Sequence, residues 1–183
     1  MLEELLHAKK LIFSFPWAQP SWSLFIFLFW LIGSLIYTAA SGRGRLLTIL
    51  VSVYMSKLIL VEAPFLTKFL EKHISGAGLA FVNLIIFGGI FSVLFFFLAR
   101  YVFKTSFDGH STKSLIFAEG FAFLQVGLLI NISLNLLPAA AKTTLHPLVH
   151  YLFIRPEVNF IWLVLPVIYL IVFGKHLTSK HEM

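Results

Sequence analysis

The polar side chains that interrupt the long apolar runs of this sequence are its first candidates for chemistry. Lys57 lies near the end of one run, and Glu119 and Gln125 lie inside another. A charge at the centre of a membrane-spanning helix costs about 2.5–3.5 kcal/mol, so each such group needs a reason to be there. Lys57 could bind an anion or pair with a carboxylate, and the three side chains together could line a solute pathway. We favour a simpler interpretation for Lys57, because it is only about one turn from the end of its run and its long side chain could reach the lipid head groups.

A second set of residues has spacing that is typical of helix packing. In the run that holds Glu119 and Gln125, small and amide side chains recur on one helical stripe, from which those two residues point away. Glycines let a neighbouring helix approach closely, and amides hydrogen-bond across the contact, so the stripe predicts packing first and permeation second. Gly88 and Ser92 have small-xxx-small spacing in another run and also predict helix association. The stripe residues are Gly120, Gly127, Asn131 and Asn135.

Metal binding and catalysis have little support in the sequence. His146 and His150 stand at i and i+4, a spacing that can place two imidazoles on one metal ion, but no third ligand is in helical relation to them. The chain has no nucleophile elbow, phosphate loop or His-Glu-x-x-His motif. A membrane-embedded enzyme would require Glu119, His73 and His110 to lie together. We therefore predict no metal, no cofactor, no catalytic residue and no enzymatic activity.

The composition indicates which solvent surrounds these residues. Charged residues make up 12% of the 183 positions and hydrophobic residues 59%, against about 25% and about 45–50% in soluble domains. A water-soluble fold could not cover itself with so few charges, so lipid must surround most of the side chains. The absence of cysteine excludes disulfides and thiolate metal sites. The net charge of +6 lies mainly between the apolar runs, which favours anionic lipid head groups over nucleic acid as the partner.

Five apolar runs supply the elements that must position the polar residues. Crossing a hydrocarbon core of about 30 Å takes about 20 helical residues, and the first, third and fourth runs are long enough. The second is short and carries Lys57, and the fifth is short and contains Pro166. No stretch alternates polar and apolar residues as a membrane barrel requires. The sequence predicts an all-α integral membrane protein, a single domain over residues 1–183 with a bundle of four to five transmembrane helices. The predicted spans are residues 21–40, 46–61, 79–99, 115–137 and 158–173.

Three amphipathic segments separate or precede these runs, at residues 1–13, 64–74 and 145–154. Each is followed directly by the first, third or fifth run, so with five spans all three lie on one side of the membrane. We predict interfacial helices that lie flat among the head groups. The alternative is that each segment extends the following membrane helix beyond the interface.

The first four runs resemble the colicin V production protein family, which are small bacterial inner-membrane proteins. The resemblance covers roughly residues 21–138. Gly33 precedes a glycine-rich turn at Ser41–Arg45 that is similar to that family's Arg-Gly turn, with Ser52 in the next helix. The stretch Ala118–Gly127 is similar to its fourth helix, which is rich in small residues. The usual aspartate at the start of the first helix is missing, and the N-terminal segment and fifth run are extra. The resemblance implies a non-enzymatic role in envelope homeostasis or export and transfers no catalytic residue.

Our leading hypothesis is a small, non-enzymatic, multi-pass protein of the bacterial inner membrane. It would act by packing with a second copy or with a membrane protein partner, with lipid around it and no nucleic acid. The alternative is a transport or channel component, in which polar residues of the second and fourth runs line a pathway.

Overall fold

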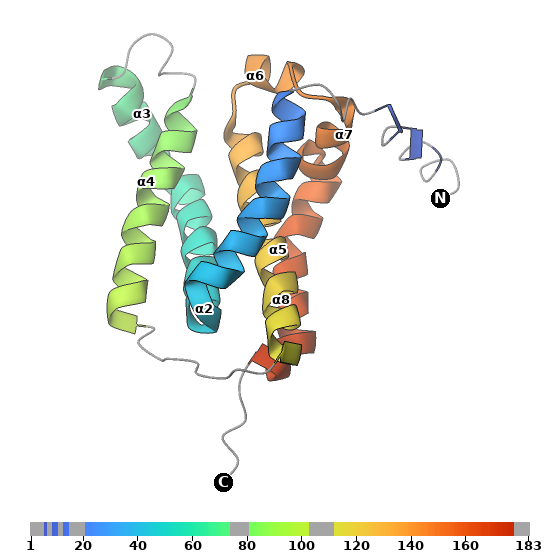
Figure 1. Cartoon of the computed structure of the whole chain (residues 1–183). Helices are drawn as coiled ribbons and strands as arrows, with labels where there is room; N and C mark the ends of the chain where they lie inside the picture. The colour runs from blue at the N-terminus through green and yellow to red at the C-terminus, as the bar shows by residue number, and fades with distance from the viewer. Residues whose placement is uncertain are drawn as a thin grey trace.

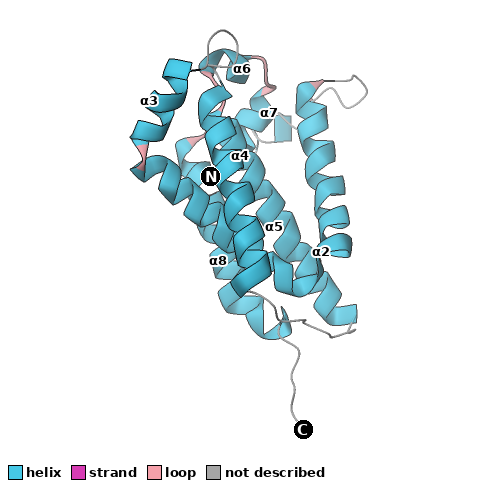
Figure 2. Ribbon diagram, turned by 90° about the vertical axis from the view of Figure 1, so that its left-hand side faces the viewer, coloured by secondary structure: helices cyan, strands magenta, loops and turns pink. Residues whose placement is uncertain are grey.

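A computed structural model describes residues 6, 9–10, 13–14, 21–73, 81–102 and 112–177. Nearly all of these residues are helical and none of them forms a strand, as Figure 2 shows, so the predicted all-α class is confirmed for the part of the chain that the structure describes. The predicted amphipathic helix over residues 1–13 lies outside the described residues except at isolated positions. Helices of alternating direction form a bundle, with the ends of α3 and α6 at one end of it (Figure 1).

The first two predicted spans form one long helix, α2 (Trp22–Glu62). Residues 41–45, expected as a turn, have helical backbone, yet the helix doubles back there (Figure 1). Trp30 contacts Trp162 at a ring-centroid distance of 5.5 Å, while the Tyr54 hydroxyl donates to the backbone oxygen of Leu163. In a straight helix, positions 30 and 54 would be about 36 Å apart. The Ser-Gly-x-Gly sequence at the bend is of the kind at which helices kink sharply.

We call residues 22–38 of α2 the first limb and residues 46–62 the second limb. The second limb leads to α3 (Pro64–His73), whose last turn carries Lys72 and His73, as suits the negative end of a helix dipole. Next comes α4 (Val82–Phe97), which continues into a π-helical turn, η2 (Leu98–Val102).

Prolines set the boundaries in the rest of the chain. Arg155 has extended backbone (φ −59°, ψ 142°) before Pro156, since proline disfavours the helical conformation in the residue that precedes it. Pro147 starts a helix in the same way, where its missing N–H has no cost. The elements in chain order are α5 (Thr112–Leu136), α6 (Ala139–Thr143), α7 (Pro147–Val149), the π-helical turn η3 (His150–Ile154) and α8 (Pro156–Leu177).

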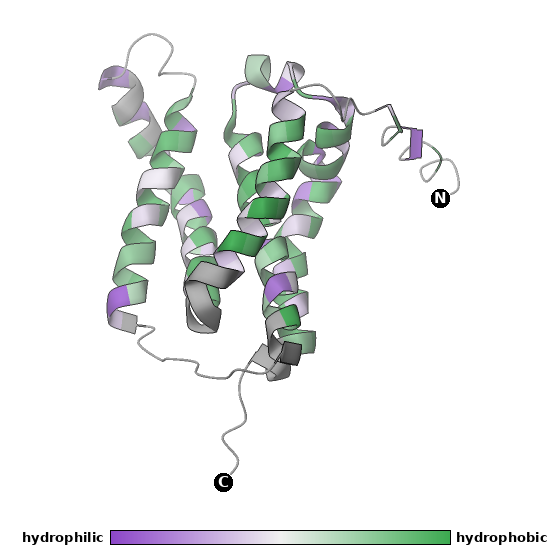
Figure 3. Ribbon diagram, viewed as in Figure 1, coloured by the Kyte–Doolittle hydropathy of each residue, from purple (hydrophilic) through white to green (hydrophobic). Residues whose placement is uncertain are grey.

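Three helical segments are long and apolar enough to cross a membrane, namely Val82–Tyr101, Ile116–Leu136 and Pro156–Phe173. The first limb is a shorter apolar helix, Trp22–Thr38. Hydrophobic residues cover most of the length of these helices, as Figure 3 shows. Many large apolar side chains point outward, including Phe29 and Ile171, which are 66% and 75% exposed. Such a surface suits contact with hydrocarbon.

Helix α5 is the centre of the bundle, and its two sides pack into two clusters. Phe121 and Ala122 pack with the second limb, including Leu46 and Val53. Further along α5, a second cluster joins the first limb to the segment α7–η3. Its buried members are Val126, Ile130, Leu134, Leu145, Val149 and Phe153. The segment 145–154, expected to lie flat among head groups, therefore packs its apolar face into the bundle.

Candidate functional site

Gln125 joins both limbs of α2 to α5. Its side chain is 1% exposed. The Nε2 group donates to the backbone oxygen of Leu46 at 2.6 Å, and Oε1 accepts from the Tyr37 hydroxyl at 3.0 Å. Tyr37 belongs to the first limb and Leu46 to the second, so one amide holds together the two sides of the bend. The amide considered for a solute pathway is thus bonded within the core.

Asn131 and Asn135 bind the chain where α8 begins. The break between η3 and α8 leaves carbonyl groups of η3 without helical donors. Asn131 Nδ2 donates to the backbone oxygen of Phe153 at 2.6 Å, and Asn135 Nδ2 donates to the same oxygen at 3.0 Å. Side-chain amides therefore replace missing backbone donors, as broken helices inside membrane proteins require. The Oδ1 atom of Asn131 is buried and has no hydrogen-bond partner within the described residues.

Gly120 and Gly127 lie against aromatic rings of α8. A Cβ atom added to Gly127 would overlap the six-membered ring of Trp162, and one added to Gly120 would overlap the Tyr169 hydroxyl. Both rings are fixed by other bonds: Trp162 Nε1 donates to the Leu152 backbone oxygen at 2.8 Å, and the Tyr169 hydroxyl donates to a carbonyl of α5 at 3.0 Å. The stripe predicted on α5 is therefore occupied inside the chain, by side chains rather than by a bare helix backbone.

Lys57 and Glu119 remain apart from these bonds. Lys57 is half-buried near the end of α2, and Glu119 is half-buried near the start of α5. Among the described side chains, no hydrogen bond or ion pair joins either residue to another group. The structure therefore does not bring the three residues Lys57, Glu119 and Gln125 together through direct contacts.

The histidines contact backbone groups. His146 Nδ1 accepts from the backbone N–H of Leu148 at 3.1 Å, and His150 Nε2 lies 2.8 Å from the backbone oxygen of Lys142. No three metal-ligating side chains gather within the described ranges. His73 is exposed on α3, and His110, the other histidine considered for an enzyme, lies outside the described residues.

Gly88 and Ser92 are placed differently from the glycines of α5. Nothing approaches within 4 Å of a Cβ atom built on Gly88 or on its neighbour Gly89. Ser92 is exposed, and its hydroxyl donates to the Gly88 backbone oxygen at 2.8 Å, along its own helix. These residues of α4 are therefore open to the surroundings of the chain.

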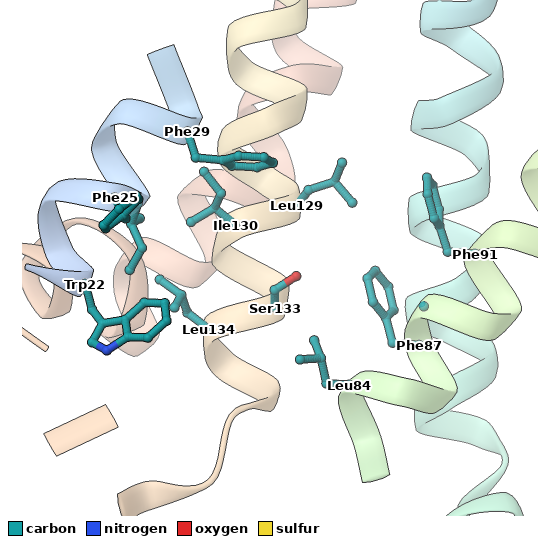
Figure 4. A pocket seen from close by; sticks show the side chains of 12 residues that line it. Trp22, Phe25, Phe29, Leu84, Phe87, Phe91, Leu129, Ile130, Ser133 and Leu134 are labelled. Carbon is teal, nitrogen blue, oxygen red and sulfur yellow. The ribbon is translucent and has the colours of Figure 1, made fainter. Parts of the chain in front are cut away.

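An open groove lies between α4, the first limb of α2 and α5 (Figure 4). Its volume is about 650 Å³, and its walls are almost entirely hydrocarbon. Ser133 of α5 points its hydroxyl toward the open space, facing Phe87 and Leu84 of α4. Phe25 and Phe29 of the first limb complete the opposite wall. We call this space the lateral groove.

Sequence reasoning missed the aromatic residues that organise the site. Trp30 donates from Nε1 to the Phe123 backbone oxygen at 2.9 Å and stacks on the Phe123 ring at 4.2 Å. Tyr37 and Tyr54 reach across to other helices in the same way. The available signal was an aromatic ring with one polar atom inside an apolar run, since that atom must find a partner when it is buried.

Comparison with known proteins found no relative: no family model, no curated protein and no solved structure matches the chain. The resemblance to the colicin V production family stays a prediction that rests on the residues quoted for it.

Proposed function

We propose that this chain is a non-enzymatic, multi-pass integral membrane protein that acts by packing with a second copy of itself. One observation carries the proposal. The amides and glycines of α5 contact other parts of the chain, whereas nothing lies within 4 Å of a Cβ atom built on Gly88 or Gly89 of α4. The alternative, a solute pathway lined by Lys57, Glu119 and Gln125, has less support because Gln125 is bonded to Tyr37 and Leu46.

The proposal includes five membrane crossings. Three come from the long apolar segments of α4, α5 and α8. The two limbs of α2 supply the others, since 17 residues extend about 26 Å along a helix, close to the hydrocarbon thickness of about 30 Å. The large apolar side chains on their outer sides would then contact lipid, which removes the cost of exposing them to water.

The packing face is the outer side of α4. Ile85, Gly89, Ser92 and Phe96 follow the i, i+4, i+7, i+11 pattern of one helical face, and all four are exposed. Gly89 and Ser92 form a shallow notch between two large side chains. A face of this kind suits association in lipid, where close backbone approach replaces the hydrophobic effect as the attraction. Two copies related by a two-fold axis can present the same face to each other, so one chain suffices to make the contact.

In this proposal the dimer lies in a bacterial inner membrane and serves envelope homeostasis or export. The support for that setting is the residue resemblance to the colicin V production family.

Single-cysteine crosslinking tests the packing face, because the natural chain contains no cysteine. We expect Ser92→Cys to give a disulfide-linked dimer when native membranes are oxidised. Val172→Cys, on the outer side of α8 and 57% exposed, is the matched control and should stay monomeric. Adding Gly89→Trp to the Ser92→Cys variant should strongly reduce the dimer, because the bulky ring fills the notch.

Equal crosslinking of the two cysteine variants, or none at all, would rule out a contact at α4. Release of the protein from membranes by alkaline carbonate without detergent would overturn the five crossings themselves.

A further inference from the structure

The lateral groove has a length that matches one leaflet of a bilayer. Its walls come from residues 22–29 of α2, 84–91 of α4 and 129–134 of α5. These stretches of six to eight residues extend about 9–12 Å along a helix, which is within the about 15 Å of one leaflet's half of the hydrocarbon core. A transmembrane helix that docked there would run through the whole core of about 30 Å and would be about 10 Å wide, so most of it would lie beyond the groove. The hydrocarbon tail of a lipid belongs to a single leaflet and matches the length better.

The walls also have the right chemistry for a hydrocarbon tail. Phe25, Phe87, Phe91 and Leu129 offer only carbon atoms to the space. Gly88 leaves the α4 wall without a side chain, and nothing within 4 Å takes up the room. A tail in this groove gains dispersion contacts on several sides, which it lacks on a flat helix surface.

The groove lies at the end of the bundle where α3 and α6 carry three lysines. α2 and α4 begin there, α5 ends there, and α3 and α6 lie at the same end (Figure 1). Lys142 of α6 is half-buried and donates to the Asn135 backbone oxygen at 2.7 Å, which holds its ammonium group beside the end of α5. Four basic residues lie in the described segments at this end, Lys68, Lys72, Lys142 and Arg155, against three carboxylates, Glu62, Glu71 and Glu157. Arg155 is paired with Glu157 at 3.6 Å, which leaves the lysines as the available cations.

We propose that the lateral groove binds one acyl chain of an anionic phospholipid, whose phosphate lies among the lysines of α3 and α6. The tail would match the shape of the groove. The lysines of α3 and α6 would favour an anionic head group, because lysines near a membrane surface attract anionic lipid. This proposal needs insertion in the membrane but is independent of dimerisation through the outer side of α4.

Lipid retention tests the proposal. The full chain is reconstituted in vesicles of equal phosphatidylglycerol and phosphatidylcholine, extracted in mild detergent and purified, and the bound lipid is quantified by mass spectrometry. We expect close to one phosphatidylglycerol per chain and several-fold less phosphatidylcholine. Ser133→Trp places an indole in the groove and should abolish retention. Val172→Trp, on the outer side of α8, is the size-matched control and should retain lipid as the natural chain does.

Head-group selectivity is tested separately from tail binding. Lys68→Gln combined with Lys72→Gln should retain lipid but lose most of the preference for phosphatidylglycerol. Arg100→Gln, also exposed but at the opposite end of α4, should keep the preference.

Several results would overturn the proposal. Undiminished retention in Ser133→Trp would show that the groove is not the site, and equal retention of both lipids would remove the charge argument. A disulfide-linked dimer from Ser133→Cys would show that a second copy fills the groove instead. If Ser133→Trp fails to fold, Leu84→Trp fills the same space from the α4 wall and is judged by the same measurements.

Discussion

The two sides of this bundle use glycine in opposite ways. Between α5 and α8, Gly120 and Gly127 face rings of α8 that leave no room for a side chain. On α4, Gly88 and Gly89 face open space. The same residue type therefore marks a closed contact in one place and an available surface in the other. Small residues in an apolar helix indicate a potential for packing, and only the tertiary arrangement shows whether the chain has already used it.

Hydrogen bonds repeat this contrast. The amides of Gln125, Asn131 and Asn135 reach from α5 to other elements. On α4 the hydroxyl of Ser92 bonds to its own helix. Hydrogen bonds between helices fix the helices' relative positions in lipid, because apolar contacts alone distinguish poorly between one arrangement and another. We infer that the α5–α8 contact and its neighbours hold the bundle together, while α4 forms a wall that can receive other molecules.

Alanine at the two kinds of glycine is the strongest test of this comparison. Gly127→Ala should destabilise the protein by about 1–3 kcal/mol, the range for overpacking, because Trp162 is held by Leu152 and cannot move freely. Gly88→Ala should be neutral or slightly stabilising, since alanine favours a helix by up to about 1 kcal/mol and meets no atom within 4 Å. Unfolding in mixed micelles of mild detergent and dodecyl sulfate measures both.

A similar cost for the two substitutions would remove the distinction between a closed and an open face. A stabilising Gly127→Ala would show in particular that Trp162 yields easily, and the packing argument for α8 would be wrong.

The sequence predicts the helices well but their partners poorly. The apolar runs at 79–99, 115–137 and 158–173 correspond to α4, α5 and α8 within a few residues, because run length and composition are local properties. The stripe of glycines and amides indicated that α5 would face other elements. It could not show that Tyr169 and Trp162 would be the side chains opposite, since that depends on the register of a helix far along the chain.

Three features lay beyond local patterns. Residues 41–45 contain the glycines of a turn, yet their backbone is helical while α2 reverses direction, and contacts of both limbs with α5 and α8 accompany that reversal. The lateral groove depends on the distance between α4 and α5, which no residue pattern encodes. The segment 145–154 had the predicted amphipathic pattern, but that pattern could not show that its apolar face packs on α5.

The two hydrogen bonds of the Gln125 side chain provide the second test. Gln125→Leu removes both bonds and leaves the Tyr37 hydroxyl without this acceptor in the core. Bonds between membrane helices contribute about 0.6 kcal/mol on average and up to about 2 kcal/mol, so we expect a loss of about 1–2 kcal/mol. Tyr37→Phe should cost less, because the bond from Gln125 to Leu46 remains. The same unfolding titration, with the double variant added, gives the coupling between the two residues.

A loss in Gln125→Leu that is no larger than in Tyr37→Phe would mean that the bond to Leu46 contributes nothing. The bend in α2 would then depend on apolar packing alone.

Asn131→Leu should cost less stability than Gly127→Ala or Gln125→Leu, although Asn131 is fully buried. Its Nδ2 bond to Phe153 is shared, because Asn135 donates to the same oxygen and keeps it satisfied. Its Oδ1 atom lacks a partner among the described residues, so leucine also removes a buried acceptor that costs free energy when unpaired. The two effects oppose each other, and we expect a change of about 0.6 kcal/mol or less.

Asn135→Leu added to Asn131→Leu should cost more than the sum of the single changes, since only the double variant leaves the Phe153 oxygen with neither amide. Additive losses in the titration would show that this oxygen does not need the amides, and the α5–α8 contact would then depend on ring packing against Gly120 and Gly127.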